Sequence, residues 1–476
     1  MKKVSLFFLI ALLVSTSGVF ASGLSIPEQG AAAMGMSAAM TARSEDLSSI
    51  YYNPAGMDYI QKSESFIGLT PIMPRHKFSS DSESLESEKK AFVPPNLYFG
   101  HRFSDRVVFG FGMFTPYGLG TDWNEDWNGR YTSTYSEVKS LYVTPALSVK
   151  VFEMLSVGLS YSWIWSDAAI SKKIDSGLAI YGATAALDPA SANPMMVANP
   201  KYDSEFALEG DGGGTSYTLG MMLRPMDRLQ IGLTYTGETE LVYEGMAKFS
   251  HPVGYEAMLG ALMPGSQSGE AVLKLPSSFN IGAKLDITSK WDAEIDLNFV
   301  NWSAYDSLTI DLSKGLPTSR LAVDKHWDDT MVFRLGTSYD LSDVTTLRFG
   351  FLSDKAPIPS ETYDAQLPDG DRLGFSLGIG RELNIGGVPI RLDASYMYLQ
   401  FKDTDKDNYV GYQDVGSIDG DTGLPTNLMK DGVVNVADQA IMDSMMTQMG
   451  RGLYPVGNGT YESHANLFSV SATYRF

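Results

Sequence analysis

The C-terminal stretch NLFSVSATYRF, residues 466–476, alternates between large apolar and small polar side chains. Phe468, Val470, Ala472, Tyr474 and Phe476 fall on one face, whereas Ser469, Ser471, Thr473 and Arg475 fall on the other. A period of two residues is the pattern of a β-strand with one apolar face. The same period recurs in SVGLSYSWIWS (156–166), WDAEIDLNF (291–299), MVFRLGTSY (331–339) and LGFSLGIG (373–380). The repetition predicts an all-β protein.

A soluble β-sandwich would alternate in the same way, with its apolar face turned inward. Two features favour a transmembrane β-barrel instead. Many of the expected strands are about ten residues or longer, which suits a tilted membrane crossing. The connections also alternate in length, as they do in outer-membrane barrels. The short turns lie at 104–106, 225–227, 289–290 and 341–343, and the long external loops at 74–95, 115–137, 175–213, 248–270, 312–326, 354–370 and 403–466.

We therefore expect an antiparallel transmembrane barrel of about fourteen strands, an even number that returns both termini to the periplasm. Lipid offers no hydrogen bonds to a strand, so the sheet must close on itself and turn its apolar faces outward. The strands are expected to begin near Ser65, Asn96, Val107, Val138, Leu155, Gly214, Leu229, Ala271, Trp291, Trp327, Thr346, Asp371, Pro389 and Leu467.

Residues 1–21 are predicted to be a secretory signal peptide, with Lys2 and Lys3, an apolar core over 4–14 and a small-residue cleavage site before Ser22. The chain contains no cysteine, so an exported protein of this kind has no disulfide framework. Its formal net charge is −20. This charge argues against a nucleic-acid partner and against a polybasic contact with anionic lipid.

Residues 22–62 do not alternate and are expected to form an N-terminal hatch ahead of a barrel over 63–476. The stretch SIPEQGAAAMGMSAAMTA (25–42) predicts a short helix, because Ser25 and Glu28 have capping-box spacing and Pro27 suits a first helical position. The turn Asn53-Pro54-Ala55 follows, since Asn before Pro is driven out of the helical region. This bend would let the segment fold back and plug the lumen.

The stretch GAAAMGMSAAMTARSEDLSSIYYNPAGM (30–57) resembles the N-terminal hatch of the FadL/TodX family of outer-membrane channels for hydrophobic compounds. That hatch carries an Asn-Pro-Ala turn, matched here by Asn53, Pro54 and Ala55. Further family-like stretches are VVFGFGMFTPYGLGTDW (107–123), LKLPSSFNIGAKLD (273–286), WDAEIDLNFVNWSAYDSL (291–308), the segment 347–380 and the closing YRF.

The resemblance implies a plugged barrel in the bacterial outer membrane that takes up hydrophobic compounds passively when ligand binding shifts the hatch. Long-chain fatty acids or aromatic hydrocarbons would be the substrates, and the surrounding lipid the other partner of a monomer. Substrate would meet an apolar groove on the external loops, pass to a lumen site and leave sideways through a kink in the third strand. A lateral exit has a physical reason, because an apolar solute gains free energy by entering lipid and loses it by crossing water.

The sequence offers residues for each of these steps. Exposed apolar clusters on external loops indicate a groove, although the same residues could merely pack the loops together. The groove residues are Leu178, Ile180, Tyr181, Met195, Met196, Tyr255, Met258, Leu259, Leu262 and Met263. For the lateral opening, Gly110, Gly112 and Pro116 lie in or after the third strand, where a bulge or a simple strand end would fit.

For a lumen site that binds carboxylate, the resemblance implies basic residues, and Lys172, Lys173 and Lys325 lie in comparable regions. Asp167 occupies a position where a base is expected. A neutral aromatic hydrocarbon would not need the cation, so fatty acid and hydrocarbon both stay open.

The last long loop carries the one pattern that suggests a cofactor. Oxygen ligands could hold a structural calcium ion, although the spacing between Asp421 and Asp431 is too long, no bidentate Glu closes the loop, and a solvated acidic loop also explains the pattern. The ligands would be Asp419, Asp421, Asp431, Asn435 and Asp438.

An enzyme or a general porin are the alternatives of other classes. The pattern G-x-S-x-G at 374–378 lies within a continuous alternation, whereas a nucleophile elbow requires a strand–turn–helix bend. The five histidines show no metal or triad spacing, so a lipase-type enzyme is not expected. A general porin would have an open lumen, which an N-terminal plug would block.

Overall fold

The computed structural model describes residues 23–476 except 44, 314–319, 413–435, 449 and 451–452. The predicted signal peptide lies outside the described residues. The chain forms one closed antiparallel barrel of fourteen wall strands, so the predicted fold class is confirmed. The barrel closes where β1 (Ser63–Leu69) pairs with β22 (Gly459–Arg475), with Glu64 opposite Arg475. On its other side β1 pairs with β4 (Pro95–Arg102).

Some wall strands run unbroken and others are interrupted partway. Besides β4 and β22, the unbroken strands are β7 (Tyr135–Phe152), β8 (Leu155–Ile174), β9 (Ser204–Met226), β18 (Thr345–Asp354), β19 (Arg372–Ile385) and β20 (Val388–Phe401). The interrupted strands are β1 with β2 (Ile72–Ser79), β5 (Val107–Phe114) with β6 (Gly118–Asp122), β10 (Leu229–Thr236) with β11 (Thr239–Ser250), β12 (Ser266–Leu275) with β13 (Ser278–Thr288), β14 (Trp291–Val300) with β15 (Ser307–Leu312), and β16 (Arg320–Asp324) with β17 (Thr330–Ser342). Two short strands, β3 (Ser84–Glu86) and β21 (Thr404–Lys406), extend the sheet at its rim.

The alternation predicts the orientation of the side chains correctly. On β8, Leu159, Trp163 and Trp165 are exposed on the outer face, whereas Ser160 and Ser162 between them are buried inside. The exposed set forms the apolar band that lipid requires around the barrel. Among the described residues, no helix combines the length and the apolar content needed to cross a membrane.

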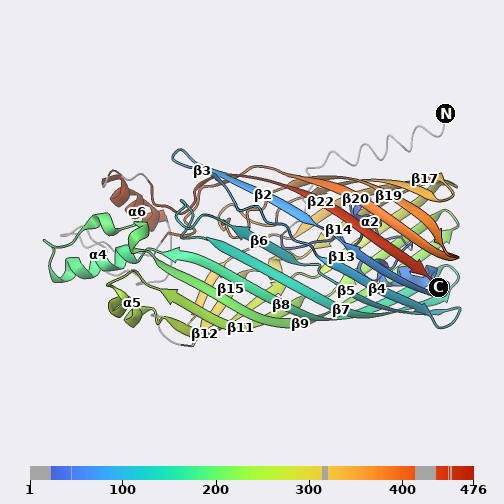
Figure 1. Cartoon of the computed structure of the whole chain (residues 1–476), viewed down its shortest axis with the longest axis horizontal. Helices are drawn as coiled ribbons and strands as arrows, with labels where there is room; N and C mark the ends of the chain where they lie inside the picture. The colour runs from blue at the N-terminus through green and yellow to red at the C-terminus, as the bar shows by residue number, and fades with distance from the viewer. Residues whose placement is uncertain (1–22, 44, 314–319, 413–435, 449, 451–452) are drawn as a thin grey trace.

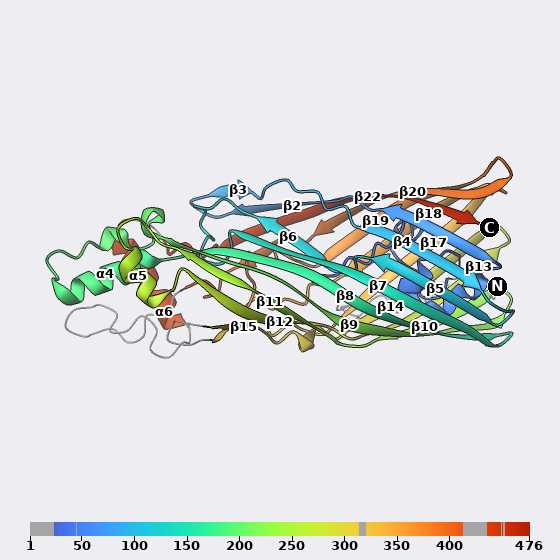
Figure 2. The same ribbon diagram turned by 60° about the horizontal axis from the view of Figure 1, so that its bottom comes forward.

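The barrel is long, and its strands run obliquely to the long axis (Figures 1 and 2). One end carries the helices α4 (Ser176–Leu187), α5 (Glu256–Leu262) and α6 (Val436–Gln448), while the C-terminus and the short turns lie at the other end (Figure 1). Three short 3-10 turns, η2 (Pro194–Met196), η3 (Pro200–Tyr202) and η4 (Trp302–Ala304), complete the connections.

Several strands extend further toward the helical end than the alternation predicts. β9 begins at Ser204 rather than near Gly214, and β22 begins at Gly459 rather than near Leu467. The predicted loop 74–95 contains the end of β2 and all of β3. The reason is visible on β9, where the inner face carries Phe206 and Leu208 while the outer face has lost its apolar residues. Because the outer face lacks large apolar residues here, the sequence does not show the alternation that marks a lipid-facing strand.

The described residues of the segment 24–60 lie inside the barrel and are nearly all buried. This hatch contains α2 (Ala31–Met34), α3 (Ser49–Tyr52) and the 3-10 turn η1 (Pro54–Tyr59). The element α2 contacts β19, β20 and β22, and η1 contacts β7, β8 and β9. The hatch therefore reaches across the lumen to opposite walls.

The predicted helix over 25–42 is wrong, because only the four residues Ala31–Met34 are α-helical. Gly30 precedes them with φ 118, and no side chain caps this helix. Beyond it, the backbone N–H groups of Met40 and Thr41 donate to the carboxylate of Asp296 on β14 rather than to helical carbonyls. Contacts with the wall override the helix propensity of alanine and methionine.

Candidate functional site

The side-chain amide of Asn53 holds the Asn53-Pro54-Ala55 turn together and ties it to the wall. The Oδ1 atom of Asn53 accepts a hydrogen bond from the Ala55 N–H at 3.1 Å. The Nδ2 group donates to the carbonyl of Thr41 at 2.8 Å and to the carbonyl of Met221 on β9 at 3.1 Å. The Asn53 side chain is fully buried, so its donors and its acceptor all need partners. Asparagine is the residue that supplies both.

Glycines on the inner wall make room for this turn. Gly158 on β8 and Gly220 on β9 are directly opposite each other. A Cβ on Gly158 would lie 2.2 Å from the Ala55 nitrogen, and one on Gly220 would lie 2.2 Å from Asn53 Oδ1. Glycine is therefore required here for close approach of the two backbones. Three further opposed pairs face the hatch in the same way: Gly100 with Gly110, Gly232 with Gly282, and Gly336 with Gly350.

Buried charges hold the hatch at two further places, and sequence reasoning missed both. Arg43 is completely buried and pairs with Asp292 and Glu294 of β14. Asp58 receives two hydrogen bonds from the guanidinium of Arg224 on β9, at 2.7 and 2.8 Å. Charged residues on the inward positions of WDAEIDLNF were the available signal, because carboxylates that face a plugged lumen are buried and require cationic partners.

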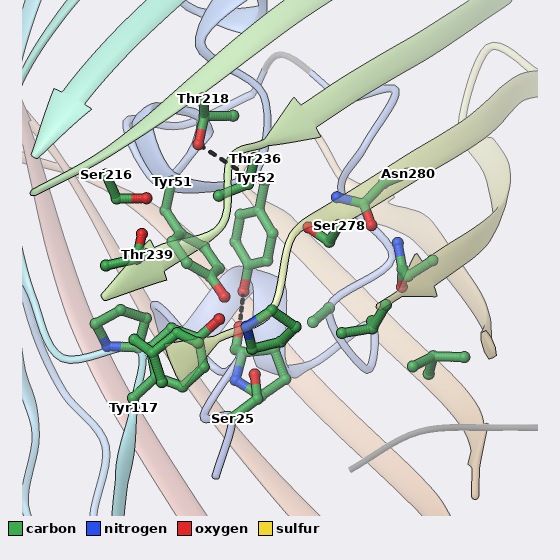
Figure 3. Close-up of a pocket in the computed structure, with 18 of the residues that line it drawn as sticks. Ser25, Tyr51, Tyr52, Tyr117, Ser216, Thr218, Thr236, Thr239, Ser278 and Asn280 are labelled. Carbon is green, nitrogen blue, oxygen red and sulfur yellow. Dashed lines mark hydrogen bonds between the residues drawn. The ribbon is translucent and has the colours of Figure 1, made fainter. Parts of the chain in front are cut away.

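A polar chamber of about 140 Å³ lies between the hatch and the wall (Figure 3). Tyr51 and Tyr52 of the hatch face it, and Tyr52 OH donates to the carbonyl of Pro27. From the wall, Thr218 and Thr236 are hydrogen-bonded to each other at 3.0 Å. The other hydroxyl and amide groups labelled around it come from Ser25, Tyr117, Ser216, Thr239, Ser278 and Asn280. Hydroxyl groups favour water, so this chamber does not suit an apolar solute.

A second cavity, of about 100 Å³, is mostly apolar and lies in the outer extensions of the strands; we call it the apolar chamber. Its apolar lining comes from the hatch, the wall and the loops: Leu24, Val138, Ala168, Ile170, Leu208, Leu273, Leu308, Ile310, Trp327 and Leu367. Lys325 is the cation of its lining. Its Nζ lies 2.7 Å from Asp364 Oδ2, and both side chains are buried.

The three predicted lumen lysines separate into two groups. Lys172 follows the chamber residue Ile170 on the same inward face of β8, and its side chain makes no hydrogen bond or ion pair with any described residue. Lys325 lines the chamber. The placement of Lys173 in the lumen site is corrected, because neighbouring residues of a strand point to opposite faces and Lys173 follows the inward Lys172. Its Nζ lies 3.1 Å from Glu125 Oε2 and 3.8 Å from Glu205 Oε2. Asp167 is exposed on that other face, so it does not oppose a ligand in the lumen.

A third cavity, of about 520 Å³, opens beside β6; we call it the side cavity. β6 pairs along its length with β7 alone, whereas β5 pairs with β4 and β7. Pro116 lies at this break, and its carbonyl accepts the N–H of Ile26 from the hatch at 2.7 Å. Much of the lining is apolar, including Phe92, Val93, Pro94, Leu399, Phe401, Ala465 and Leu467. The side cavity shares Val138 and Leu367 with the apolar chamber, so the two adjoin.

The predicted lateral residues fall on different sides of this break. Pro116 lies at the break between β5 and β6, where it lines the polar chamber while its neighbour Thr115 lines the side cavity, but Gly110 and Gly112 lie in the regularly paired part of β5. A Cβ on Gly110 would lie 2.4 Å from Met57 Sδ of the hatch, and one on Gly112 would meet Tyr98. The two glycines therefore make room inside the barrel and are not at the opening, which corrects that part of the prediction.

The predicted groove residues lie in the layer of external loops, where most of them are buried. Leu178 packs in a cluster with Tyr131 and Tyr454, and Ile180, Met196, Leu259 and Met263 are buried in the main apolar cluster. Met195 and Met258 are exposed. Tyr181 and Tyr255 are half-buried, and the side chain of Leu262 is not described. The loops thus pack on one another at these positions.

Asp175 organises this loop layer, and sequence reasoning missed it. Its carboxylate caps α4 by accepting the Leu178 N–H, and it also accepts the Ala198 N–H and the Tyr454 OH at 2.9 Å. Burial, together with the charge of Asp203, raises the pKa of Asp175 to about 6. One side chain therefore joins two loops that are far apart in the sequence.

The proposed calcium ligands Asp419, Asp421, Asp431 and Asn435 lie outside the described residues, as does the side chain of Asp438. Within the described part of the chain, no three His, Cys, Asp or Glu residues are grouped to hold a metal ion. Ser376 of the G-x-S-x-G pattern faces the hatch, where its Oγ accepts the Ser37 N–H at 2.9 Å. Calcium binding stays a prediction.

A lipid-facing barrel whose lumen is filled by its own N-terminal segment, with apolar cavities above that segment, defines a plugged outer-membrane transport channel. The model of the family described as outer membrane protein transport protein (OMPP1/FadL/TodX) matches residues 12–476. The chain belongs to this family of outer-membrane channels for hydrophobic compounds, whose members are transport proteins.

Relatives and solved structures are similar over most of the chain. The long-chain fatty acid transport protein of Escherichia coli O6:H1 is 23% identical over 412 residues, which cover 82% of this chain and 90% of that protein. A putative outer membrane protein of Neisseria meningitidis serogroup B is 24% identical over 420 residues, 83% of this chain and 90% of that one. The crystal structure of a Pseudomonas aeruginosa FadL homologue matches with a TM-score of 0.75 at 19% identity, covering 96% of this chain and 100% of that one. The Pseudomonas putida toluene transporter TodX matches with a TM-score of 0.61 at 16% identity, covering 96% and 98%.

Proposed function

We propose that this channel takes up hydrophobic compounds such as long-chain fatty acids and releases them sideways into the outer membrane through the side cavity. The observation that supports this most directly is the contact between two apolar cavities. The apolar chamber shares Glu137, Val138 and Leu367 with the side cavity, which lies beside β6, a strand that pairs with β7 but not with β4. The shared lining supports a path from one cavity to the other that bypasses the polar chamber between hatch and wall.

Charge at the apolar chamber favours a fatty acid within this class. Lys172 and Lys325 are two inward cations that share one buried counter-ion, Asp364, while Glu137 of the chamber lining is paired with Lys139. A ligand carboxylate would supply the second negative charge in a buried place, where an uncompensated charge is costly. The acyl chain would occupy apolar surface, which contributes about 0.8 kcal/mol for each buried CH₂ group.

An aromatic hydrocarbon is the second candidate, and the Lys325–Asp364 ion pair is the observation that favours it. Because this lysine already has a counter-ion, the chamber does not require a ligand charge at that position. In either case we expect both termini on the periplasmic side, away from the helices of the loop layer.

The test is uptake of labelled oleate and labelled toluene by cells with and without the protein. Faster entry of oleate supports the fatty acid channel, and faster entry of toluene alone supports the hydrocarbon channel. Equal entry of both compounds with and without the protein contradicts the proposal. Single-channel conductance provides an independent measurement, because a plugged channel passes little ionic current and a general porin passes a large one.

A further inference from the structure

The first described residue of the hatch, Gly23, is enclosed between the side cavity and two aromatic rings. Its N–H donates to Asp369 Oδ2 at 2.9 Å, and the residue lines the side cavity. A Cβ on Gly23 would lie 2.6 Å from the ring of Trp302 and 2.9 Å from the ring of Trp327. Its φ of 67 is a conformation that favours glycine. The start of the hatch is therefore fixed beside Asp369.

Asp369 is a buried carboxylate that has only neutral hydrogen-bond donors. Within the described part of the chain, it accepts hydrogen bonds from the backbone N–H groups of Gly23 and Gly370, both at 2.9 Å, and forms no ion pair. Burial raises the pKa of Asp369 to about 6, so the group is still mostly ionised at neutral pH. A buried negative charge of this kind requires a positive charge nearby.

Glu28 of the hatch is a second buried carboxylate, and it lines the same cavity as Gly23 and Asp369. Its Oε1 atom has no hydrogen-bond partner among the described residues. The guanidinium groups whose charges act on it are those of Arg372 and Arg334. Arg372 already makes two hydrogen bonds to a carboxylate oxygen of β18, and Arg334 donates to neutral oxygens.

The charges around the hatch start do not balance. Among the described residues, three buried carboxylates share two buried guanidinium groups: Glu28, Asp354 and Asp369 with Arg334 and Arg372. Asp371 is half-buried and adds further negative charge. The lysines of the cavity lining, Lys90 and Lys139, have carboxylate partners of their own. His76 of the lining is neutral, because burial lowers its pKa to about 4. The group therefore lacks a positive charge.

The predicted removal of the signal peptide supplies a cation at this position. Hydrolysis of the Ala21–Ser22 peptide bond by water, catalysed by the protease that removes the leader, leaves a carboxylate on Ala21 and an α-ammonium group on Ser22. Because consecutive Cα atoms are about 3.8 Å apart, this ammonium group is one residue from Gly23. We propose that the α-ammonium group of the mature chain is the missing counter-ion, and that it pairs with Asp369 and Glu28 at the side cavity. Export processing thus completes the charge balance of the hatch start, whichever compound the channel transports.

The test measures how tightly this α-amino group binds its proton in the full mature chain. Intact mass first establishes that the chain begins at Ser22. The amine is then dimethylated with isotope-labelled formaldehyde in urea, which preserves its charge, and the refolded protein is titrated by NMR in detergent. We expect the parent to bind the proton on the order of tenfold more tightly than Asp369→Asn, the lower end of the effect of a nearby opposite charge. Asp369→Glu should retain the tighter binding.

A further variant separates the ion pair from a structural role of Asp369. Two glycines inserted between Ala21 and Ser22 move the ammonium group away while the bond between Gly23 and Asp369 can still form. This insertion should weaken proton binding as much as Asp369→Asn does. Glu361→Gln, exposed on the same loop, is the matched control and should titrate like the parent. Barrel assembly is checked for each variant by its resistance to unfolding in detergent.

Two results would overturn the inference. One is a mature chain that begins at a residue other than Ser22. The other is equal proton binding in the parent, in an assembled Asp369→Asn variant and in the chain with the inserted glycines. Neither result affects the uptake proposal, because the measurement contains no substrate.

Discussion

Gly158 on the wall and Ala55 in the hatch are in direct backbone contact, so close that a Cβ on Gly158 would lie 2.2 Å from the Ala55 nitrogen. Ser148 on the neighbouring strand β7 donates to the Ala55 carbonyl at 3.1 Å. The Asn-Pro-Ala turn is therefore fixed by glycine on one side and by hydrogen bonds on the others. Small substitutions at this contact should therefore raise the ionic conductance of the channel without preventing assembly of the barrel.

Replacing Gly158 by valine should displace the hatch, at a cost of about 1–3 kcal/mol as for other overpacked sites. We expect the ionic conductance of the purified channel to rise, because the plug no longer seats against β8. Gly260→Ala is the control, since a Cβ at that position meets nothing within 4 Å. An unchanged conductance in an assembled Gly158→Val protein would show that the hatch tolerates the displacement without opening.

Exchanging Asn53 for aspartate tests the amide itself. The side chain keeps its size but loses the donors to Thr41 and Met221, and two buried acceptors become unpaired at a cost of about 1–3 kcal/mol each. We expect faster proteolysis within the hatch and impaired oleate uptake, with normal assembly of the barrel. Asn193→Asp, which changes an exposed loop residue whose side chain only accepts a hydrogen bond, should match the parent. Uptake at the parental rate would contradict a working hatch.

Lys172 and Lys173 are neighbours with opposite orientations and so form a matched pair. Lys172→Met should reduce oleate uptake by on the order of tenfold, the loss expected for about 1.4 kcal/mol from a charge-assisted hydrogen bond. Toluene uptake should not change, because a hydrocarbon does not use the cation. Lys173→Met should leave both rates unaltered. Equal effects of the two substitutions would refute the assignment of Lys172 to the ligand site.

The exit route can be blocked from within one strand. Ala465 of β22 lines the side cavity, whereas Ala472 of the same strand faces lipid. Ala465→Trp should fill the cavity and stop uptake while the barrel still resists heating in detergent. Ala472→Trp should transport normally. Transport at full rate in the Ala465→Trp protein would mean that substrate leaves by another path.

Asp175 gives the loop layer a defined pH dependence. Its pKa in the folded protein, about 6, is above the ordinary value of an aspartate, so the folded loops bind this proton more tightly than the unfolded chain. The stabilising contribution is present in full below about pH 4 and is lost as the pH rises through about 6. Thermal unfolding of the parent and of Asp175→Asn should therefore differ between pH 4 and pH 7. Hydrogen exchange at the Leu178 and Ala198 amides locates the change, and parallel curves for the two proteins would contradict it.

The amino-acid sequence by itself determined the barrel. The period of two in stretches such as 156–166 and 466–476 is set by the alternation of lipid and lumen on the two faces of each strand, and this rule is local. The hatch turn was equally local, because Asn53 and Pro54 restrict their own backbone. The helix expected over 25–42 failed for the converse reason, since its conformation depends on partners such as Asp296 that lie far along the chain.

Only the tertiary structure decided where the ligand site lies and what it contains. Lys172 and Lys173 are equivalent in sequence, and the register of β8 alone assigns one to the lumen and the other to the outside. Lys325 pairs with Asp364 and Gly23 with Asp369, and no local pattern indicates that these distant residues are linked. Closure of the sheet brings them together, because a barrel converts distant segments into neighbours around one enclosed space. A charge that is buried in that space requires a partner, and the local sequence does not show which distant residue provides it.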